Sequence, residues 1–242
     1  MVHTLPDYTT KYKLAKIFGQ IDSGELAARL KSIDTFDRRG NIVFIDDFEG
    51  SAIHWNILLG NAAPTCALNT TTARSGSQCV KITTGADALG FVTMRRDFPG
   101  LFSNRIGVEI SIYNTAAKGK IYFTLFGFTG YNYYTSSIKL NVEEAKLYYE
   151  DETSAYVELA SNIFIPTTYH TFIPLKFVID AVTGNYIRCI YNNIEYDMIG
   201  LTPASGADTT SAQTHVVMYF ENVDAVARVY YIDDFILTQN EP

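Results

Sequence analysis

The chain of 242 residues is 47% apolar, 14% aromatic and 19% charged, a composition that excludes a wholly disordered protein. Its net charge of -7 argues against a nucleic-acid partner, because nucleic-acid-binding proteins normally carry a basic surface. No run of about 18 apolar residues occurs, so we expect no membrane-spanning helix and no membrane partner. The 17 tyrosines and 15 phenylalanines favour strands.

The first 40 residues differ in pattern from the rest. Residues 1–22 carry scattered apolar side chains without a periodic face, which indicates an extended arm. Asp22 and Glu25 have the spacing of a capping box, so we expect a helix of about two turns, too short to be stable alone. We expect the segment to dock on a neighbouring subunit through its apolar side chains. These are Leu5, Tyr8, Tyr12, Leu14, Ile17, Phe18, Leu26 and Leu30.

From residue 41 onward, short apolar or alternating runs are separated by turn residues. The expected strands are 42–45, 67–71, 77–83, 90–96, 105–113, 120–128, 133–140, 145–149, 155–159, 169–180, 186–191, 194–198, 215–221 and 228–238. The small residues of 203–211 predict a loop. The pattern predicts an all-β protein, a two-sheet jelly-roll β-sandwich over residues 41–242, preceded in residues 1–40 by the arm and one short helix.

The sequence Ile-Asp-Asp-Phe occurs at 45–48 and again at 232–235, which predicts that the first and last strands are neighbours. Acidic side chains would then converge at one edge of the domain. They are Asp46, Asp47, Glu49, Asp233 and Asp234. Calcium binds about six to eight oxygen ligands, so a structural calcium is one interpretation of this cluster. The other is that these side chains cap the ends of strands.

The chain has three cysteines, an odd number, so they cannot all be paired in internal disulfides. Cys79 and Cys189 lie within apolar strand patterns, which favours buried free thiols. A bridge between Cys66 and Cys79 stays open as an alternative. The cysteine spacing does not indicate a zinc site.

The hairpin pattern over 180–197, with an Asp at the strand end and turns at Thr183-Gly184 and Asn192-Asn193, resembles the central hairpins of concanavalin A-like lectin/glucanase (laminin-G-like) jelly rolls. The runs 46–55 and 231–235 are similar to the first and last strands of such domains and of jelly-roll carbohydrate-binding modules. The resemblance covers residues 42–238 and implies the fold more than a function. The segment 24–40 looks like the leader of uncharacterised virion-associated proteins.

Glycanases of the resembled fold place two or three carboxylates at alternate positions of one strand, as nucleophile and acid. Glu195 and Asp197 alternate in this way, but no further Glu follows at the needed position. No Gly-x-Ser-x-Gly elbow accompanies the four histidines. We therefore expect no catalytic residues and no enzymatic activity, with a glycan hydrolase or lyase of unfamiliar catalytic residues as the remaining enzymatic alternative.

Two non-enzymatic functions remain. The first is a structural protein of a virion or similar assembly, such as a capsid decoration protein, that forms a homo-oligomer (a trimer is one closed form) and docks on other structural proteins through its arm. Without a signal peptide, it would be made in the host cytoplasm. The alternative is a lectin-like, extracellular carbohydrate-binding module that stacks exposed aromatic rings on sugars. Its candidate glycan-binding residues are Trp55, Tyr131, Tyr133 and Tyr134.

Overall fold

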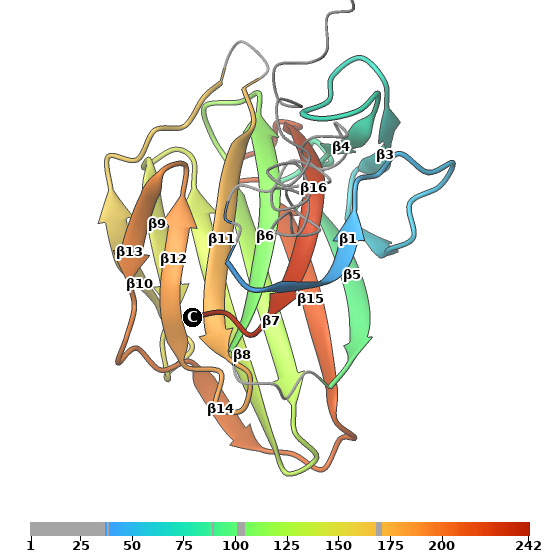
Figure 1. The fold of residues 1–242 in the computed structure, drawn as a ribbon. Helices are drawn as coiled ribbons and strands as arrows, with labels where there is room; N and C mark the ends of the chain where they lie inside the picture. The colour runs from blue at the N-terminus through green and yellow to red at the C-terminus, as the bar shows by residue number, and fades with distance from the viewer. Residues whose placement is uncertain (1–36, 38, 89, 101–104, 168–170) are drawn as a thin grey trace, which may run out of the picture.

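A computed structural model describes residues 37, 39–88, 90–100, 105–167 and 171–242. These residues form two antiparallel eight-stranded sheets stacked as two layers (Figure 1). The first sheet contains, in spatial order, β13 (Ile194–Asp197), β12 (Tyr186–Tyr191), β11 (Ile173–Asp180), β6 (Arg105–Asn114), β16 (Val229–Gln239), β4 (Cys79–Thr83) and β3 (Thr65–Asn69), with β1 (Asn41–Asp46) beside β16. The second contains β10 (Tyr156–Ser161), β9 (Lys146–Glu150), β8 (Asn132–Asn141), β7 (Lys120–Phe128), β15 (Gln213–Glu221), β5 (Phe91–Pro99) and β2 (Asn56–Leu59), with β14 (Ala204–Ala207) beside β8.

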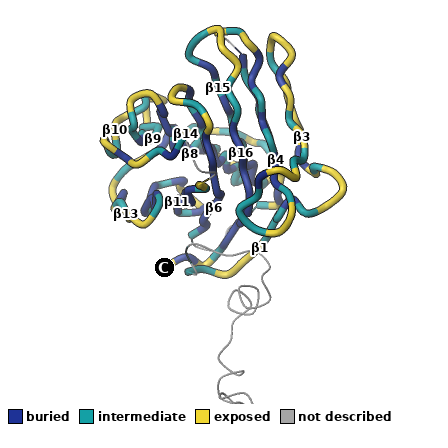
Figure 2. Tube along the Cα trace, turned by 90° about the horizontal axis from the view of Figure 1, so that it is seen from above, coloured by how far each residue is buried: buried dark blue, intermediate teal, exposed yellow. Residues whose placement is uncertain are grey.

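The hydrophobic core lies between the two sheets and follows from the alternation of side chains along each strand. In β7, Ile121, Phe123 and Leu125 are buried, while Tyr122 and Phe126 on the other face are only partly buried. Such a period of two places every second residue against the opposite sheet. Buried positions therefore run along the central strands, and exposed ones gather in the connecting loops (Figure 2).

The expected all-β sandwich is confirmed, and most strands lie within a few residues of their predicted bounds. Two strands were not expected. β2 is a four-residue edge strand, and β14 lies inside the predicted loop 203–211. β14 pairs through its backbone with Asn132–Thr135 of β8, so the small side chains of Ala204–Ala207 gave no strand pattern.

The first and last strands are neighbours, as the repeated Ile-Asp-Asp-Phe predicts. β1 runs antiparallel to β16, with Asp46 opposite Phe235. A bulge in β16 at Asp233 and Asp234, where Asp234 has a φ of 51°, divides the strand. β4 pairs before the bulge and β1 pairs after it, so the bulge marks the point where one edge of β16 changes partner.

The predicted arm and helix lie outside the described residues. The same holds for their apolar side chains Leu5, Tyr8, Tyr12, Leu14, Ile17, Phe18, Leu26 and Leu30. Of the predicted leader 1–40, only residues 37, 39 and 40 are described. Across the described ranges, no helix is long and apolar enough to cross a membrane.

The cysteines are free thiols in the structure. Cys79 and Cys189 are buried, as their apolar surroundings in the sequence indicate, and Cys66 is partly buried. The alternative of a Cys66–Cys79 bridge is therefore not realised here.

Candidate functional site

The outward face of the second sheet carries a row of side chains that crosses seven strands. The strand registers place them directly side by side in the order Leu58, Thr93, Tyr219, Tyr122, Lys139, Tyr148 and Glu158. Side chains opposite one another in adjacent strands point to the same face. None of the seven is buried, and their neighbours along the strands, such as Phe123 and Ile138, point into the core. The row therefore faces away from the core.

Aromatic rings make the row continuous. The ring centroids of Phe91 and Tyr219 are 5.3 Å apart, those of Tyr219 and Tyr122 are 5.5 Å apart, and those of Tyr122 and Tyr156 are 5.4 Å apart. These separations are in the range of favourable aromatic pairs. We call the set Phe91, Tyr219, Tyr122, Lys139, Tyr148 and Tyr156 the tyrosine row. It extends over strands β5, β15, β7, β8, β9 and β10.

Hydrogen-bonding groups accompany the rings. The Tyr122 hydroxyl donates to Glu221 Oε2 at 2.8 Å, and the Tyr148 hydroxyl donates to Glu144. Farther along the face, Ser137 Oγ lies 3.0 Å from the hydroxyl of Tyr156. Burial raises the pKa of Tyr156 to about 12, so this hydroxyl stays protonated at neutral pH. Ring faces beside hydroxyls and carboxylates suit a ligand that has both C–H faces and hydroxyl groups.

A second polar cluster lies on the same face. Asp97 Oδ1 is 2.6 Å from both Arg95 Nε and His215 Nδ1, and the rings of Phe128 and His215 form a T-shaped pair with centroids 5.4 Å apart. Burial raises the pKa of Asp97, but hydrogen bonds from Arg95 and His215 outweigh this effect, so the pKa is lowered overall. His215 is 6% exposed and already has its partners. This arrangement is that of a strand histidine held by hydrogen bonds to its neighbours.

Two of the predicted glycan-binding aromatics are buried, so the expectation that they face a sugar is wrong. Trp55 is 6% exposed, and its Nε1 donates to Asp46 Oδ2 at 2.9 Å. Tyr134 is 3% exposed, and its hydroxyl donates to the backbone oxygen of Ala181 at 3.1 Å. In both residues, the ring and the polar atom therefore contact other parts of the fold and are not available to a sugar.

The other two predicted aromatics are accessible. Tyr131 is 81% exposed between β7 and β8. Tyr133 is partly buried and lies opposite Phe128. It is six residues before Lys139 on β8, so both point to the same outward face. A glycan contact at these residues stays a prediction.

The five carboxylates expected to hold calcium accept hydrogen bonds from within the chain. Glu49 Oε1 accepts from the backbone nitrogens of Ser77 and Gln78, both at 2.8 Å. Asp233 Oδ2 accepts from the backbone nitrogens of Arg74 and Ser75 at 2.8 and 3.2 Å. The remaining three behave similarly. Asp46 Oδ1 and Asp47 Oδ1 accept from backbone nitrogens two residues ahead, and Asp234 pairs with Arg74 Nη1 at 2.7 Å.

The bonds of Glu49, Asp233 and Asp234 attach the 74–78 loop to the strand ends around the β16 bulge. Among the described residues, no group of three or more His, Cys, Asp or Glu side chains is placed to hold a metal ion. Binding of calcium by Asp46, Asp47, Glu49, Asp233 and Asp234 therefore gains no support from their placement and stays a prediction. Their contacts agree with the other interpretation, in which these side chains cap the ends of strands.

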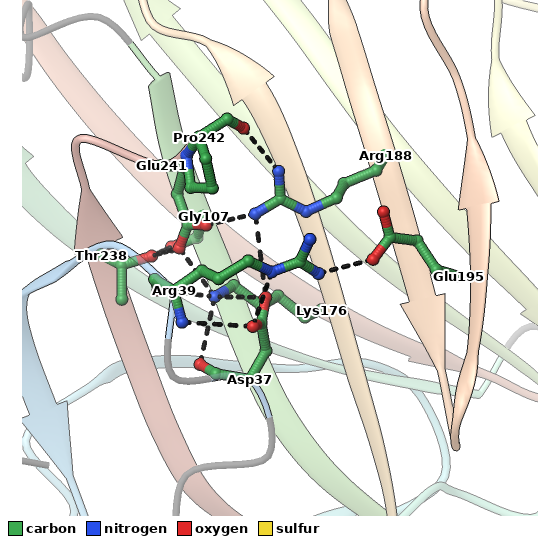
Figure 3. Close-up of polar contacts among 9 residues, drawn as sticks. All are labelled: Asp37, Arg39, Gly107, Lys176, Arg188, Glu195, Thr238, Glu241 and Pro242. Atoms are coloured by element: carbon green, nitrogen blue, oxygen red, sulfur yellow. Dashed lines mark hydrogen bonds and ion pairs between the residues drawn. The ribbon is translucent and has the colours of Figure 1, made fainter.

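The outward face of the first sheet carries a buried ionic cluster that the sequence did not indicate (Figure 3). Lys176 on β11 is fully buried, with its Nζ 2.7 Å from Glu241 Oε1 and 3.1 Å from Asp37 Oδ2. Arg188 on β12 pairs with the other oxygen of Glu241. Its Nη1 also donates to the backbone oxygen of Pro242 at 2.6 Å. The cluster therefore holds both ends of the described chain on one sheet face.

The rim of this cluster is more exposed. Arg39 joins Asp37 to Glu195, with its Nη2 2.5 Å from Glu195 Oε2. A groove of about 400 Å³ opens beside it. Its lining consists of Arg39, Arg105, Ile187, Arg188, Glu195, Asp197, Ile199 and Pro242. Most charges along the groove are paired within the chain, so we assign the cluster a structural role.

No protein-family model matches the sequence, and a search of curated proteins finds no relative. Several solved structures share the fold. The cellulose induced protein Cip1 superposes with a TM-score of 0.57 at 18% identity, over 81% of this chain and 97% of its own. An endo-beta-1,4-glucuronan lyase from the fungus Trichoderma reesei gives 0.55 at 10% identity, over 83% and 96%.

The third is a protein of unknown function with a galectin-like fold from Bacillus subtilis, with a TM-score of 0.52 at 11% identity, over 84% of this chain and 97% of its own. At these identities the similarity establishes the jelly-roll sandwich alone. It agrees with the fold that the resemblance to concanavalin A-like domains implies.

Proposed function

We propose that this protein is a carbohydrate-binding protein that holds a glycan chain along the tyrosine row. The observation that carries the proposal is the in-register alignment of Tyr219, Tyr122, Lys139 and Tyr148 on one outward sheet face. Aromatic faces pack on the C–H surfaces of sugars, and hydroxyl and carboxylate groups beside them bind sugar hydroxyls. The row supplies both in a continuous strip.

The dimensions of the row suit a chain rather than a single sugar. From β15 to β9 the row crosses three strand spacings, or roughly 14 Å, and it continues onto β5 and β10. Hydrogen-bonding groups lie along this length, from Glu221 to Glu144. Support also comes from the fold, which this chain shares with a cellulose induced protein and a glucuronan lyase.

The role in a virion assembly depends on residues 1–36, which lie outside the described part of the chain. That role, and the expectation that the protein is not an enzyme, stay predictions.

The proposal is tested by measuring the binding of soluble oligosaccharides to the full chain by titration calorimetry. We expect Tyr219→Ala to weaken binding about tenfold, because it removes a central ring whose contact is worth on the order of 1 kcal/mol. Tyr131→Ala is the comparison variant for the alternative contact at Tyr131, a highly exposed tyrosine outside the row, and it should bind like the parent protein if the glycan lies along the row. Equal effects of the two variants, or an effect of Tyr131→Ala alone, would place the site elsewhere. The absence of binding to every glycan would reject the function.

A further inference from the structure

Lys139 occupies the centre of the tyrosine row. It lies on β8 with Tyr122 opposite on β7 and Tyr148 opposite on β9. Its Nζ is 4.0 Å from the ring centroid of Tyr148 and 4.4 Å from that of Tyr156. The ammonium group is therefore held between aromatic rings on the face where the glycan is proposed to bind.

Within the described structure, Lys139 has no carboxylate ion-pair partner, in contrast to nearby lysines. Lys146 Nζ lies 2.7 Å from Glu158 Oε2, Lys118 Nζ lies 2.8 Å from Glu143 Oε1, and Lys120 Nζ lies 3.8 Å from Glu221 Oε2. The carboxylates on either side of Lys139 accept hydrogen bonds from tyrosines instead: Glu221 from Tyr122, and Glu144 from Tyr148. The row therefore contains one ammonium group whose charge the protein itself does not neutralise by direct contact.

The surroundings of this ammonium group favour an anionic partner. Burial lowers the pKa of Lys139 and the nearby Lys120 lowers it further, while the carboxylates of Glu144 and Glu221 raise it in part without reversing the direction. A group that is partly removed from water gains more from an opposite charge than an exposed group does, because the local dielectric constant is lower. The protein as a whole has a net charge of -7, so a polyanion would gain little from non-specific attraction. Recognition of an anion on this face depends on the local cation.

Resting on the proposed function, we propose that the glycan is an acidic one and that Lys139 determines this specificity by pairing with an anionic substituent, a uronate carboxylate or a sulfate ester, while the tyrosine rings bind the sugar faces. The rings alone would accept a neutral chain of the same backbone. Discrimination between acidic and neutral chains therefore lies in one side chain.

The test compares three hexasaccharides of the same β-1,4-linked backbone by titration calorimetry: a neutral glucan, its glucuronic acid counterpart and a sulfated glucan. The full-length protein is expected to bind at least one acidic chain about tenfold or more tighter than the neutral one. We expect Lys139→Gln to remove this preference and Lys139→Arg to keep it. The control is Lys146→Gln, which removes a lysine already paired with Glu158 and should leave the preference intact.

The two acidic arms separate the sources of the anion, because a preference for the glucuronic acid chain alone assigns a carboxylate and a preference for the sulfated chain alone assigns a sulfate. Thermal melting of Lys139→Gln checks that the fold is retained. Stronger binding of the neutral chain, or an unchanged preference in Lys139→Gln, would overturn the role of Lys139 while leaving glycan binding intact. No binding in any arm would overturn both proposals.

Discussion

At the scale of single residues, the structure separates side chains of one type by what their polar atoms contact. Trp55 and Tyr134 lie in the core because each has a hydrogen-bond acceptor there, Asp46 Oδ2 and the Ala181 carbonyl oxygen. Tyr219 makes ring contacts on the outward face instead. A buried tyrosine or tryptophan generally needs such a partner, and the folded chain supplies it from another segment, 9 residues away for Trp55 and 47 residues away for Tyr134. Composition alone therefore could not tell which aromatics are accessible.

The thiols give a residue-scale prediction. Burial raises the pKa of Cys66, Cys79 and Cys189 to about 12 each, well above the ordinary value of about 8.5. Because the thiolate is the reactive form, we expect the native protein to react very slowly with a disulfide reagent such as DTNB at pH 8. On unfolding in denaturant, the pKa values return to normal and three thiols should react promptly. A fast native phase, or fewer than three thiols after unfolding, would contradict this expectation.

At the scale of elements, the turn between β11 and β12 requires a glycine at position 184, which leads to a prediction about stability. Gly184 has a φ of +76°, and a Cβ placed on it would lie 2.4 Å from Cγ of the buried Tyr134 ring. Gly184→Ala should therefore cost about 1 kcal/mol for the left-handed conformation and about 2 kcal/mol more for displacing the ring. The measurement is the free energy of unfolding in urea.

Gly200→Ala is the matched control for that variant. Gly200 has a φ of +91°, but no atom lies within 4 Å of the added Cβ position. We expect it to cost about 1 kcal/mol, from the backbone conformation alone. If the two variants lost equal stability, the packing of Tyr134 against Gly184 would have no energetic weight.

The elements also show how far the sequence could be interpreted. Alternation predicts β7 at Lys120–Phe128, the bounds observed, because one face of that strand is buried. It fails for β14, whose short side chains make no pattern and whose pairing is formed by the backbone. It also fails for the tyrosine row. Tyr219 and Tyr122 are 97 positions apart in the numbering, and only the register of β15 against β7 makes them neighbours.

At the scale of the whole molecule, the ionic cluster is the feature that a sequence pattern was least able to predict. Its members come from the leader, from β11 and β12, and from the end of the chain, and their charges look ordinary in isolation. The sequence pattern assigns Asp37 to the leader, before the sandwich, but its side chain contacts Lys176 on the sandwich. Burial of Lys176 is tolerated because two carboxylates and backbone oxygens surround its Nζ.

This arrangement predicts that two glutamates, Glu241 and Glu195, contribute very differently to the free energy of unfolding. Glu241 is 1% exposed and pairs with both Lys176 and Arg188, whereas the side chain of Glu195 is 48% exposed and pairs with the half-exposed Arg39. Removing the charge of Glu241 leaves two buried cations with Asp37 as their nearest remaining carboxylate. We therefore expect Glu241→Gln to lower the free energy of unfolding by about 3 kcal/mol or more.

Glu195→Gln removes the same charge from a solvent-exposed pair, for which the expected loss is below about 1 kcal/mol. Urea denaturation of the two variants beside the parent protein measures both values under one set of conditions. Added salt sharpens the comparison, because it screens the exposed pair between Arg39 and Glu195 but hardly reaches Lys176. The difference between the variants should therefore persist in 1 M salt, about the concentration at which surface pairs are screened. Equal losses in the two variants would mean that the cluster does not hold the chain ends on the sheet.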